Sequence, residues 1–154
     1  MGDLEMQMWA MVNRDRQDPR NAQETRGGHS IRVRWNERLA EVARAHSRDM
    51  LEQGFFDHVD PEGRTPAARI NAGGIPWRAL GENIAINGTV AGAEAAFMDE
   101  PRFEKNHRAN ILNTKFTDVG IGIVQAPNGS FYITQDFVTI PPGPLAVGKN
   151  SAIR

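Results

Sequence analysis

The sequence predicts an α+β domain in which helices come first, a β-hairpin comes last, and the helices cover a small antiparallel sheet. Apolar residues recur at helical spacing in several segments before residue 113, whereas from residue 118 onward they occupy alternate positions. The 154 residues are 40% hydrophobic and 24% charged, which is typical of one globular domain with a single core. Helices followed by paired strands therefore favour a layered α+β architecture.

The first half of the chain predicts two long helices separated by a loop. Helical spacing predicts a helix over 3–17, and the polar, Gly-rich residues 18–30 predict a long loop. The clearest helix is expected over 37–53, where Asn36 can cap the start and Gly54 can supply the left-handed stop. The residues expected on its buried face are Leu39, Val42, Ala43, His46 and Met50.

Three shorter helical segments are expected before the strands. The segment "RTPAARINAGG" predicts a short helix ended by Gly73 and Gly74. The segment "TVAGAEAAFMDEP" predicts another, with Thr89 as its cap and Pro101 beyond its end, so that Asp99 and Glu100 close it. The segment "NHRANILN" predicts a last helical turn.

Alternation over 119–137 predicts a β-hairpin around the turn Asn128-Gly129. Phe131, Ile133 and Phe137 share one strand face and are expected in the core, together with Phe97 of the preceding helix. Gly120 and Gly122 leave one face of the first strand bare, so a helix or a ligand can approach its backbone closely. We expect one domain over 1–140 and a mostly irregular tail over 141–154.

Composition and motif content exclude several function classes. The net charge is −1 with a pI near 6.4, and no Lys/Arg stripe forms, which argues against nucleic acid as a partner. No apolar run approaches the roughly 20 residues of a membrane span. The absence of cysteine excludes disulfides, thiolate nucleophiles and thiolate metal sites. No metalloprotease, serine hydrolase or nucleotide-binding motif is present.

One acidic residue in an apolar segment and two histidines are candidates for chemistry. Glu82 lies in "RALGENIAI", where a buried carboxylate needs water, hydrogen-bond donors or a cation. His58 precedes a rigid Asp-Pro-Glu-Gly turn in "FFDHVDPEGRTP" and could either bind a ligand or bond to the turn backbone. His107 opens "NHRANIL" and is either a ligand or an exposed first-turn residue. His29 is expected in an exposed loop, and His46 as a neutral core histidine that donates to a carbonyl.

Five segments taken together resemble one protein family. The segments are, in order, "LAEVARAHSRDM", "FFDHVDPEGRTPAARINAGG", "GENIA", "NHRANILNTKFTDVGIGIV" and "YITQDF". They resemble the bacterial branch of the CAP superfamily, also called SCP-like, which includes cysteine-rich secretory and pathogenesis-related proteins. The resemblance runs from about Met8 to Phe137. The chain departs from animal and plant members by its lack of cysteine, and from many bacterial members by the insertion "DPRNAQETRGGHSIR".

The resemblance implies a CAP-type α-β-α sandwich and a set of site residues. The family places two histidines and two acidic residues in a surface cleft, which implies His58, Glu82, Glu100 and His107 as the metal or ligand site. Asp99 is the alternative to Glu100, because many bacterial members have Ser-Pro-Gly in place of this acidic stretch. Leu80, Ile84 and Ile86 are then expected to anchor the Glu82 loop. The resemblance also implies export to the cell envelope or exterior, directed by an N-terminal signal.

Two imidazoles and two carboxylates can hold Zn²⁺ or another divalent cation. The hypothesis that we favour is a secreted module whose cleft binds a small molecule, lipid or peptide, with or without this cation. An alternative is a metal-dependent hydrolase in which Glu82 or Glu100 acts as general base. A third is a structural protein of the envelope or the stress response. The residues do not decide whether the protein is an enzyme; we expect a monomer that binds no nucleic acid.

Overall fold

The computed structural model describes residues 1–25 and 31–143. His29 and the end of the predicted tail, 144–154, lie outside the described residues. The helices are α1 (Asp3–Gln17), η1 (Pro19–Asn21), α2 (Ala22–Thr25), α3 (Glu37–Gln53), α4 (Pro66–Ala72), α5 (Val90–Met98) and α6 (His107–Leu112). The strands are β1 (Arg34–Trp35), β2 (Ala79–Asn87), β3 (Asp118–Gln125) and β4 (Phe131–Thr139).

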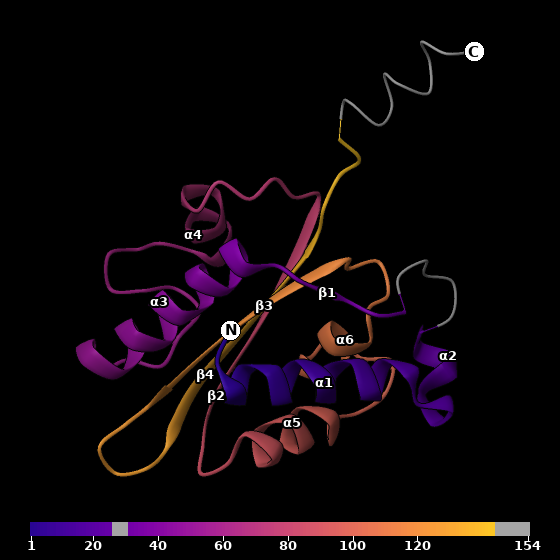
Figure 1. Ribbon diagram of the computed structural model, residues 1–154, viewed down its shortest axis with the longest axis horizontal. Coiled ribbons are helices and arrows are strands. Elements are labelled where there is room, and N and C mark those ends of the chain that lie inside the picture. The colour runs from indigo at the N-terminus through magenta and orange to yellow at the C-terminus, as the bar shows by residue number, and fades with distance from the viewer. Residues whose placement is uncertain (26–30, 144–154) are drawn as a thin grey trace.

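Helices cover both faces of one four-stranded sheet, which confirms the predicted α-β-α sandwich. The strand order is β1-β3-β4-β2, so β2 forms one edge. Figure 1 shows α3 and α4 on one side of the sheet and α1, α5 and α6 on the other. The hairpin β3/β4 is antiparallel as expected. Strand β2 also pairs with β4 in antiparallel fashion, whereas the two-residue strand β1 joins β3 in parallel. A two-residue strand carries too little alternation to be predicted from sequence.

The predicted caps of the main helices are confirmed. The Asn36 side chain accepts from the Leu39 amide at 3.0 Å, and Gly54 ends α3 with a left-handed φ of 69°. The Thr89 hydroxyl accepts from the Gly92 amide at 2.9 Å and so begins α5. Side-chain acceptors satisfy amides that have no partner inside a helix, which is why these polar residues predicted the boundaries well.

Helix α3 packs directly on the bare strand face that the glycines of β3 create. A Cβ added at Gly120 would overlap the backbone of Leu39 and Ala40, and one at Gly122 would overlap that of Ala43 and Arg44. The absent side chains therefore let the helix backbone approach the strand backbone. This close approach fixes the position of α3, from which His46 reaches toward the site.

The main core lies between the sheet and the helices α1, α5 and α6. Its fully or almost fully buried residues are Met8, Val12, Val33, Val90, Ala93, Phe97, Ile111, Leu112, Phe116, Val119, Ile121, Ile133 and Phe137. A smaller cluster under α4 contains Leu39, Ile70, Ile75 and Val138. Of the helices in 1–25 and 31–143, none is both long and apolar enough to cross a bilayer.

Two local predictions are wrong. The segment around Glu82 is strand β2 rather than a loop, because it pairs with β4 along its whole length, and its Ile86 is 42% exposed instead of anchoring the core. The predicted loop after α1 contains η1 and α2. Asp18 caps η1 by accepting from the Arg20 amide, and Arg108 binds Glu24 of α2, so tertiary contacts hold this segment in helical form.

Candidate functional site

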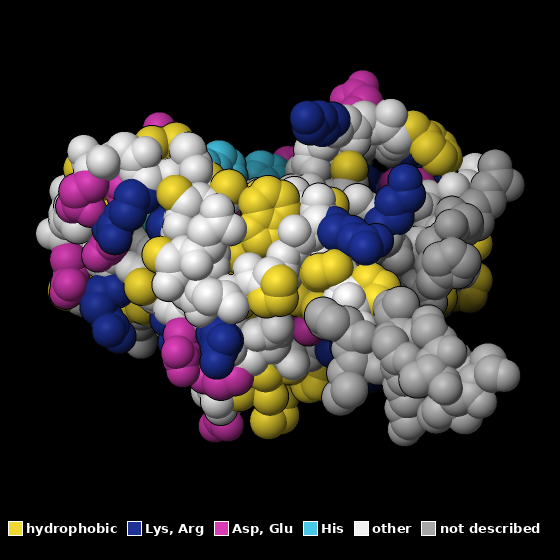
Figure 2. Space-filling model, turned by 90° about the horizontal axis from the view of Figure 1, so that it is seen from above, with side chains coloured by type: hydrophobic (Ala, Val, Ile, Leu, Met, Phe, Trp, Pro, Cys, Tyr) yellow, Lys and Arg dark blue, Asp and Glu magenta, His cyan; other side chains and the backbone are white. Residues whose placement is uncertain are grey.

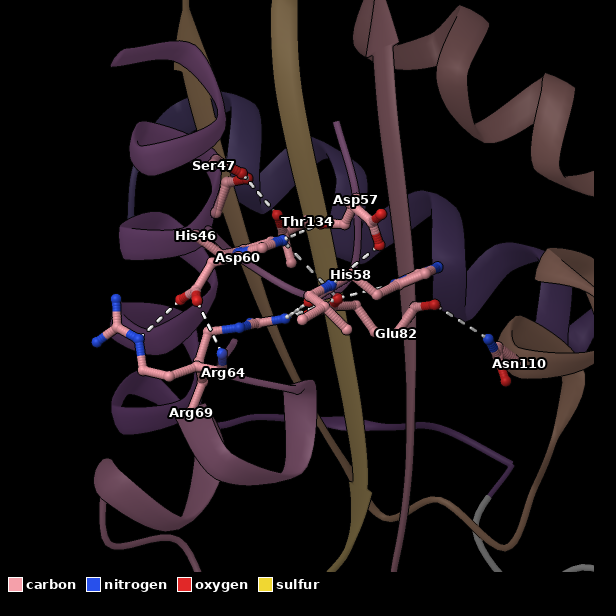
Figure 3. A network of polar contacts seen from close by, with 12 residues as sticks. His46, Ser47, Asp57, His58, Asp60, Arg64, Arg69, Glu82, Asn110 and Thr134 are labelled. Atoms are coloured by element: carbon pink, nitrogen blue, oxygen red, sulfur yellow. Dashed lines mark hydrogen bonds and ion pairs between the residues drawn. The ribbon is translucent and has the colours of Figure 1, made fainter. Parts of the chain in front are cut away.

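Glu82 lies in the middle of the edge strand β2 and its side chain is buried. Its Oε1 atom lies 2.9 Å from His58 Nδ1 and accepts a hydrogen bond from Arg69 Nη2, also at 2.9 Å. His46 Nε2 lies 4.0 Å from the same oxygen. Figure 3 shows these side chains converging on Glu82 from α3, α4 and the loop between them. The buried charge of Glu82 is thus balanced by the guanidinium group of Arg69 and by a hydrogen bond with His58.

The charge on Glu82 is strongly stabilised. Burial by itself raises the pKa of this carboxyl, but hydrogen bonds with His58, Asp136 and Arg69 outweigh burial and lower the pKa to about 2. The neighbouring Asp136 is fully buried, and its pKa is well above the ordinary value because of burial and of the Glu82 charge. Glu82 therefore carries the charge of this pair, and the proton that the two carboxyl groups share is favoured on Asp136.

His58 is presented by a rigid turn and remains accessible. Its side chain is 45% exposed, and the hydrogen bond with Glu82 raises its pKa against the effect of partial burial. The Asp60 carboxylate accepts from the amides of Glu62 and Arg64, and Arg69 Nη2 also donates to the His58 carbonyl. These bonds fix the backbone on both sides of the imidazole.

His107 forms a second pair with Glu100. The Glu100 carboxylate lies 2.6 Å from His107 Nδ1 and accepts from the His107 amide at 2.7 Å. Phe97 stacks on the imidazole with ring centroids 4.8 Å apart. Asp99, the alternative to Glu100, is the C-cap residue of α5, and it is exposed. The acidic partner of His107 is thus Glu100, which lies just beyond the helix rather than at its end.

Asn83 ties the two pairs to the same strand. It is fully buried, donates to the His107 carbonyl at 3.2 Å and to Gln135 Oε1 at 3.0 Å, and accepts from Asn110 Nδ2 at 2.8 Å. Successive strand residues face opposite sides of a sheet. Glu82 consequently reaches His58 on the α4 side, whereas Asn83 holds α6 and His107 on the other. Figure 2 shows histidine side chains gathered at one place on the surface.

The four predicted site residues form two histidine-carboxylate pairs. In the described part of the chain, no group of three or more His, Asp and Glu side chains is arranged to hold one metal ion. Both histidines use Nδ1 on a carboxylate, and no described residue bonds to Nε2 of either ring. The ring atoms left without a hydrogen bond within the described residues are therefore the two Nε2 atoms, each opposite an Nδ1 that is paired with a carboxylate.

His46 is a core histidine, as predicted. Its side chain is fully buried, its Nε2 lies 2.8 Å from the Asp57 carbonyl oxygen, and burial lowers its pKa. The sequence analysis missed Arg69 and Asp136, which set the charge on Glu82. The signal for Arg69 was that it is the one charged residue in the short helix Pro66–Ala72. For Asp136 it was a carboxyl inside the alternating strand segment, beside Phe137.

The fold and the two pairs beside an edge strand define a class of small α-β-α sandwich domain. The sequence pattern of the CAP family, described as the cysteine-rich secretory protein family, matches residues 9–137. The chain belongs to this family, and it is a member without cysteine.

Solved structures share the fold. An extracellular protein containing a SCP domain from Bacillus anthracis superposes with a TM-score of 0.70 at 25% identity over 88% of this chain and 40% of that one. An outer surface protein of Borrelia burgdorferi gives 0.73 at 15% identity, covering 90% of this chain and 95% of that one. The second likeness shows the fold alone.

Two proteins of Bacillus subtilis are similar in sequence. The uncharacterized protein YkwD is 38% identical over 104 residues, which are 67% of this chain and 38% of that protein. The uncharacterized membrane protein YlbC is 30% identical over 113 residues, or 70% of this chain and 29% of that protein. The matched region thus spans about a third of each of these relatives.

Proposed function

We propose that the protein is an exported CAP domain whose two histidine-carboxylate pairs form a surface site for a ligand and a divalent cation. The observation that carries the proposal is the shared geometry of His58 and His107. Each imidazole bonds to a carboxylate through Nδ1, and each has an Nε2 with no hydrogen-bond partner among the described residues. Histidines that bind metals in proteins usually have a carboxylate or carbonyl on the other ring nitrogen in this way.

Export is supported by the proteins that share the fold. One is described as extracellular and another as an outer surface protein. A site built from histidine and glutamate, without cysteine, is also insensitive to an oxidising exterior. We therefore place the ligand among the small molecules, lipids or peptides outside the cytoplasm.

The electrostatics of the site favour binding over hydrolysis. A Zn²⁺ ion bound here would supply Lewis-acid chemistry. Glu82, however, has a pKa of about 2 and is held by Arg69 and His58, so it is a weak base. The pKa of Glu100 is also lowered, since its hydrogen bonds and its attraction to His107 outweigh burial. The hydrolase alternative consequently gains no support from either carboxylate.

Thermal unfolding with and without Zn²⁺ tests the proposal. At free metal a hundredfold above its dissociation constant, the folded state gains about 2.7 kcal/mol, which should raise the melting temperature clearly at pH 7.5. The rise should be much smaller at pH 5, because protonated imidazole cannot bind metal. The double variant His58→Ala, His107→Ala should lose the rise.

A matched pair of variants distinguishes cation binding at the proposed site from non-specific binding to surface acids. Glu100→Gln should weaken the metal-induced rise because it changes the group behind His107, whereas Glu104→Gln alters an exposed acid on the same segment and should leave the rise unchanged. His46→Ala should lower stability and still leave the rise. Wild-type protein that shows no rise at millimolar Zn²⁺ would refute the cation part of the proposal.

A further inference from the structure

Two Asn-Gly pairs lie in similar turns of this fold but differ in the hydrogen bonding of the glycine nitrogen. Asn87-Gly88 lies between β2 and α5, and Asn128-Gly129 lies in the turn between β3 and β4. In each pair the asparagine Oδ1 accepts from the amide two residues further on, at 3.1 Å in the first pair and 2.9 Å in the second. A glycine nitrogen attacks a preceding asparagine side chain more easily than other main-chain nitrogens do, because no Cβ shields it. The two pairs can therefore be compared as candidate sites of the same reaction.

The Gly88 nitrogen is the more available of the two nucleophiles. Pairing with β4 ends at Asn87, and in the described part of the chain the Gly88 amide has no hydrogen-bond acceptor. The Gly129 amide, by contrast, donates to the Ala126 carbonyl at 2.9 Å. Gly88 is also exposed, and a Cβ added to it would meet no non-neighbouring atom within 4 Å. Base from the solvent can therefore remove the Gly88 amide proton without first breaking a hydrogen bond.

The Asn87 side chain is held beside this nitrogen. Its bond with the Thr89 amide closes a ring that contains both the carboxamide carbon, Cγ, and the Gly88 nitrogen. The same bond places a donor on Oδ1, the atom on which negative charge develops when Cγ is attacked. A Cβ added at Gly92 would lie 2.8 Å from Oδ1, so the carboxamide also lies against the first turn of α5. The partial positive charge at the start of this helix favours the same negative charge.

We propose that Asn87 is a site of spontaneous deamidation with the Gly88 nitrogen as nucleophile, and that Asn128 reacts more slowly. Solvent base takes the Gly88 amide proton, the nitrogen forms a bond to Asn87 Cγ, and the side-chain nitrogen takes a proton from water and leaves as ammonia. The product is a five-membered succinimide. Water then opens this ring: cleavage of the new bond to Cγ gives aspartate, and cleavage of the bond to the main-chain carbonyl carbon gives isoaspartate. The net reaction exchanges the side-chain NH₂ for an OH from water.

The modified residue lies in the connection between two elements of the candidate site. Strand β2 carries Glu82, and α5 carries Phe97, which stacks on His107. Isoaspartate takes the main chain through the side-chain methylene group, so it lengthens the connection between this strand and this helix. Both products also add a negative charge at the start of α5. Deamidation therefore changes the link between the two histidine-carboxylate pairs without altering a member of either pair.

Incubation of the folded protein at pH 7.5, followed by digestion and mass spectrometry of the peptides, tests the proposal. The peptides that contain Asn87 and Asn128 are each quantified in their amide, aspartate and isoaspartate forms. Asn87 should react roughly tenfold faster than Asn128, because Gly129 must first give up its hydrogen bond. In guanidinium chloride both turns are lost, and the two Asn-Gly pairs should then react at similar rates.

The matched variant is Gly88→Ala, whose new Cβ points into open space and should leave the fold unchanged. The methyl group shields the nitrogen, so the variant should suppress the products at Asn87 and leave those at Asn128 as in wild type. Equal or faster reaction at Asn128 in the folded protein would overturn the proposal, as would a preference for Asn87 that persists in guanidinium chloride. Folded protein that stays unmodified while the denatured chain reacts would also overturn it. Because no metal is added, the outcome is independent of the Zn²⁺ experiment.

Discussion

Glu82 and Asp136 face each other directly across strands β2 and β4, and both carboxyl groups are buried. Residues opposite each other in an antiparallel pair point to the same side of the sheet. Two buried carboxylates on directly opposite residues repel each other strongly, so the protonated form of one of them is favoured. Arg69 and His58 stabilise the charge on Glu82, and Asp136 therefore keeps the proton. That proton can be donated to Glu82 Oε2, which otherwise has no partner among the described residues.

The protonated state of Asp136 predicts that Asp136→Asn stabilises the protein at neutral pH. The pKa of Asp136 is raised in the folded state, so above the ordinary value of 3.8 the unfolded chain releases this proton while the folded protein keeps it. Wild-type stability therefore falls with rising pH at this site. An asparagine amide can donate to Glu82 without that cost, and we expect a gain of about 1 kcal/mol or more at pH 7, since one pKa unit corresponds to about 1.36 kcal/mol.

Urea unfolding between pH 3 and pH 8 measures this gain. The difference between Asp136→Asn and wild type should be near zero at pH 3 and should grow with pH. The control is Asp136→Leu, which removes the donor and should destabilise the protein at every pH, because Glu82 Oε2 then has no hydrogen bond. A gain that is equally large at pH 3 would show that the acid is not the source of the cost.

The glycines of β3 predict a second, purely steric effect. Gly122→Ala should destabilise by about 3 kcal/mol, because the new Cβ overlaps backbone atoms of Arg44 that cannot rotate away. Gly88→Ala is the matched control: a Cβ there meets nothing within 4 Å, and the change should be within about 1 kcal/mol of wild type. Denaturant midpoints of the two variants give the comparison, and similar values would mean that α3 does not pack against β3 as described.

The sequence predicted a close approach to the glycine face of β3, by a helix or a ligand, but it did not predict the edge of the sheet, and the reason is physical. Gly120 and Gly122 act locally, because an absent side chain on one strand face can be identified without knowing what covers it. Strand β2 depends on its partner instead. Its Gly-Glu-Asn segment resembles a turn, and only pairing with β4 holds it extended. Glu82 and Asp136 are 54 positions apart in the sequence, and tertiary structure sets the register that pairs them. Their pairing could therefore not be predicted from local sequence.

Aromatic truncations test the core. Phe97→Ala and Phe137→Ala should each cost about 3–5 kcal/mol, because these side chains are 4% and 0% exposed in the main core. The sequence pattern placed Phe131 with them, but the structure leaves it partly exposed near the hairpin turn, so Phe131→Ala should cost less, about 1–2 kcal/mol. Equal losses at all three positions, measured by urea unfolding, would contradict the hairpin register.

For the site, residue types were easier to predict than their grouping. His58 beside a turn, His107 at a helix start and Glu82 in an apolar segment stand out in the sequence itself, whereas Glu100 and the set of four were implied by the family resemblance. Their division into two pairs could not be predicted, because it follows from the alternation of Glu82 and Asn83 to opposite sides of β2. Arg69 was hidden for a related reason: its role appears only when α4 is placed beside β2.

The His58–Glu82 pair should stabilise the protein most between about pH 4.5 and 6.5. The folded pKa of Glu82 is lowered from 4.5 to about 2, so its contribution is complete above 4.5 and is lost as pH falls toward 2. The folded pKa of His58 is raised from 6.5, so its contribution is complete below 6.5 and is lost as pH rises through the folded value. Because His58 is 45% exposed, solvent screening limits the coupling to about 0.5–1 kcal/mol.

A double-mutant cycle with His58→Ala and Glu82→Gln measures this coupling from urea midpoints at pH 3, 5.5 and 8.5. We expect the largest value at pH 5.5 and smaller values at both extremes. At pH 3 the unfolded chain has a protonated Glu82 that folding must ionise, and at pH 8.5 His58 loses its proton. A second cycle with His107→Ala and Glu82→Gln serves as control and should give no coupling, because the His107 side chain pairs with Glu100. A His58–Glu82 coupling that stays constant from pH 3 to 8.5 would mean that the two groups do not form an ion pair. Coupling in the control cycle would instead indicate that the two pairs act as one site.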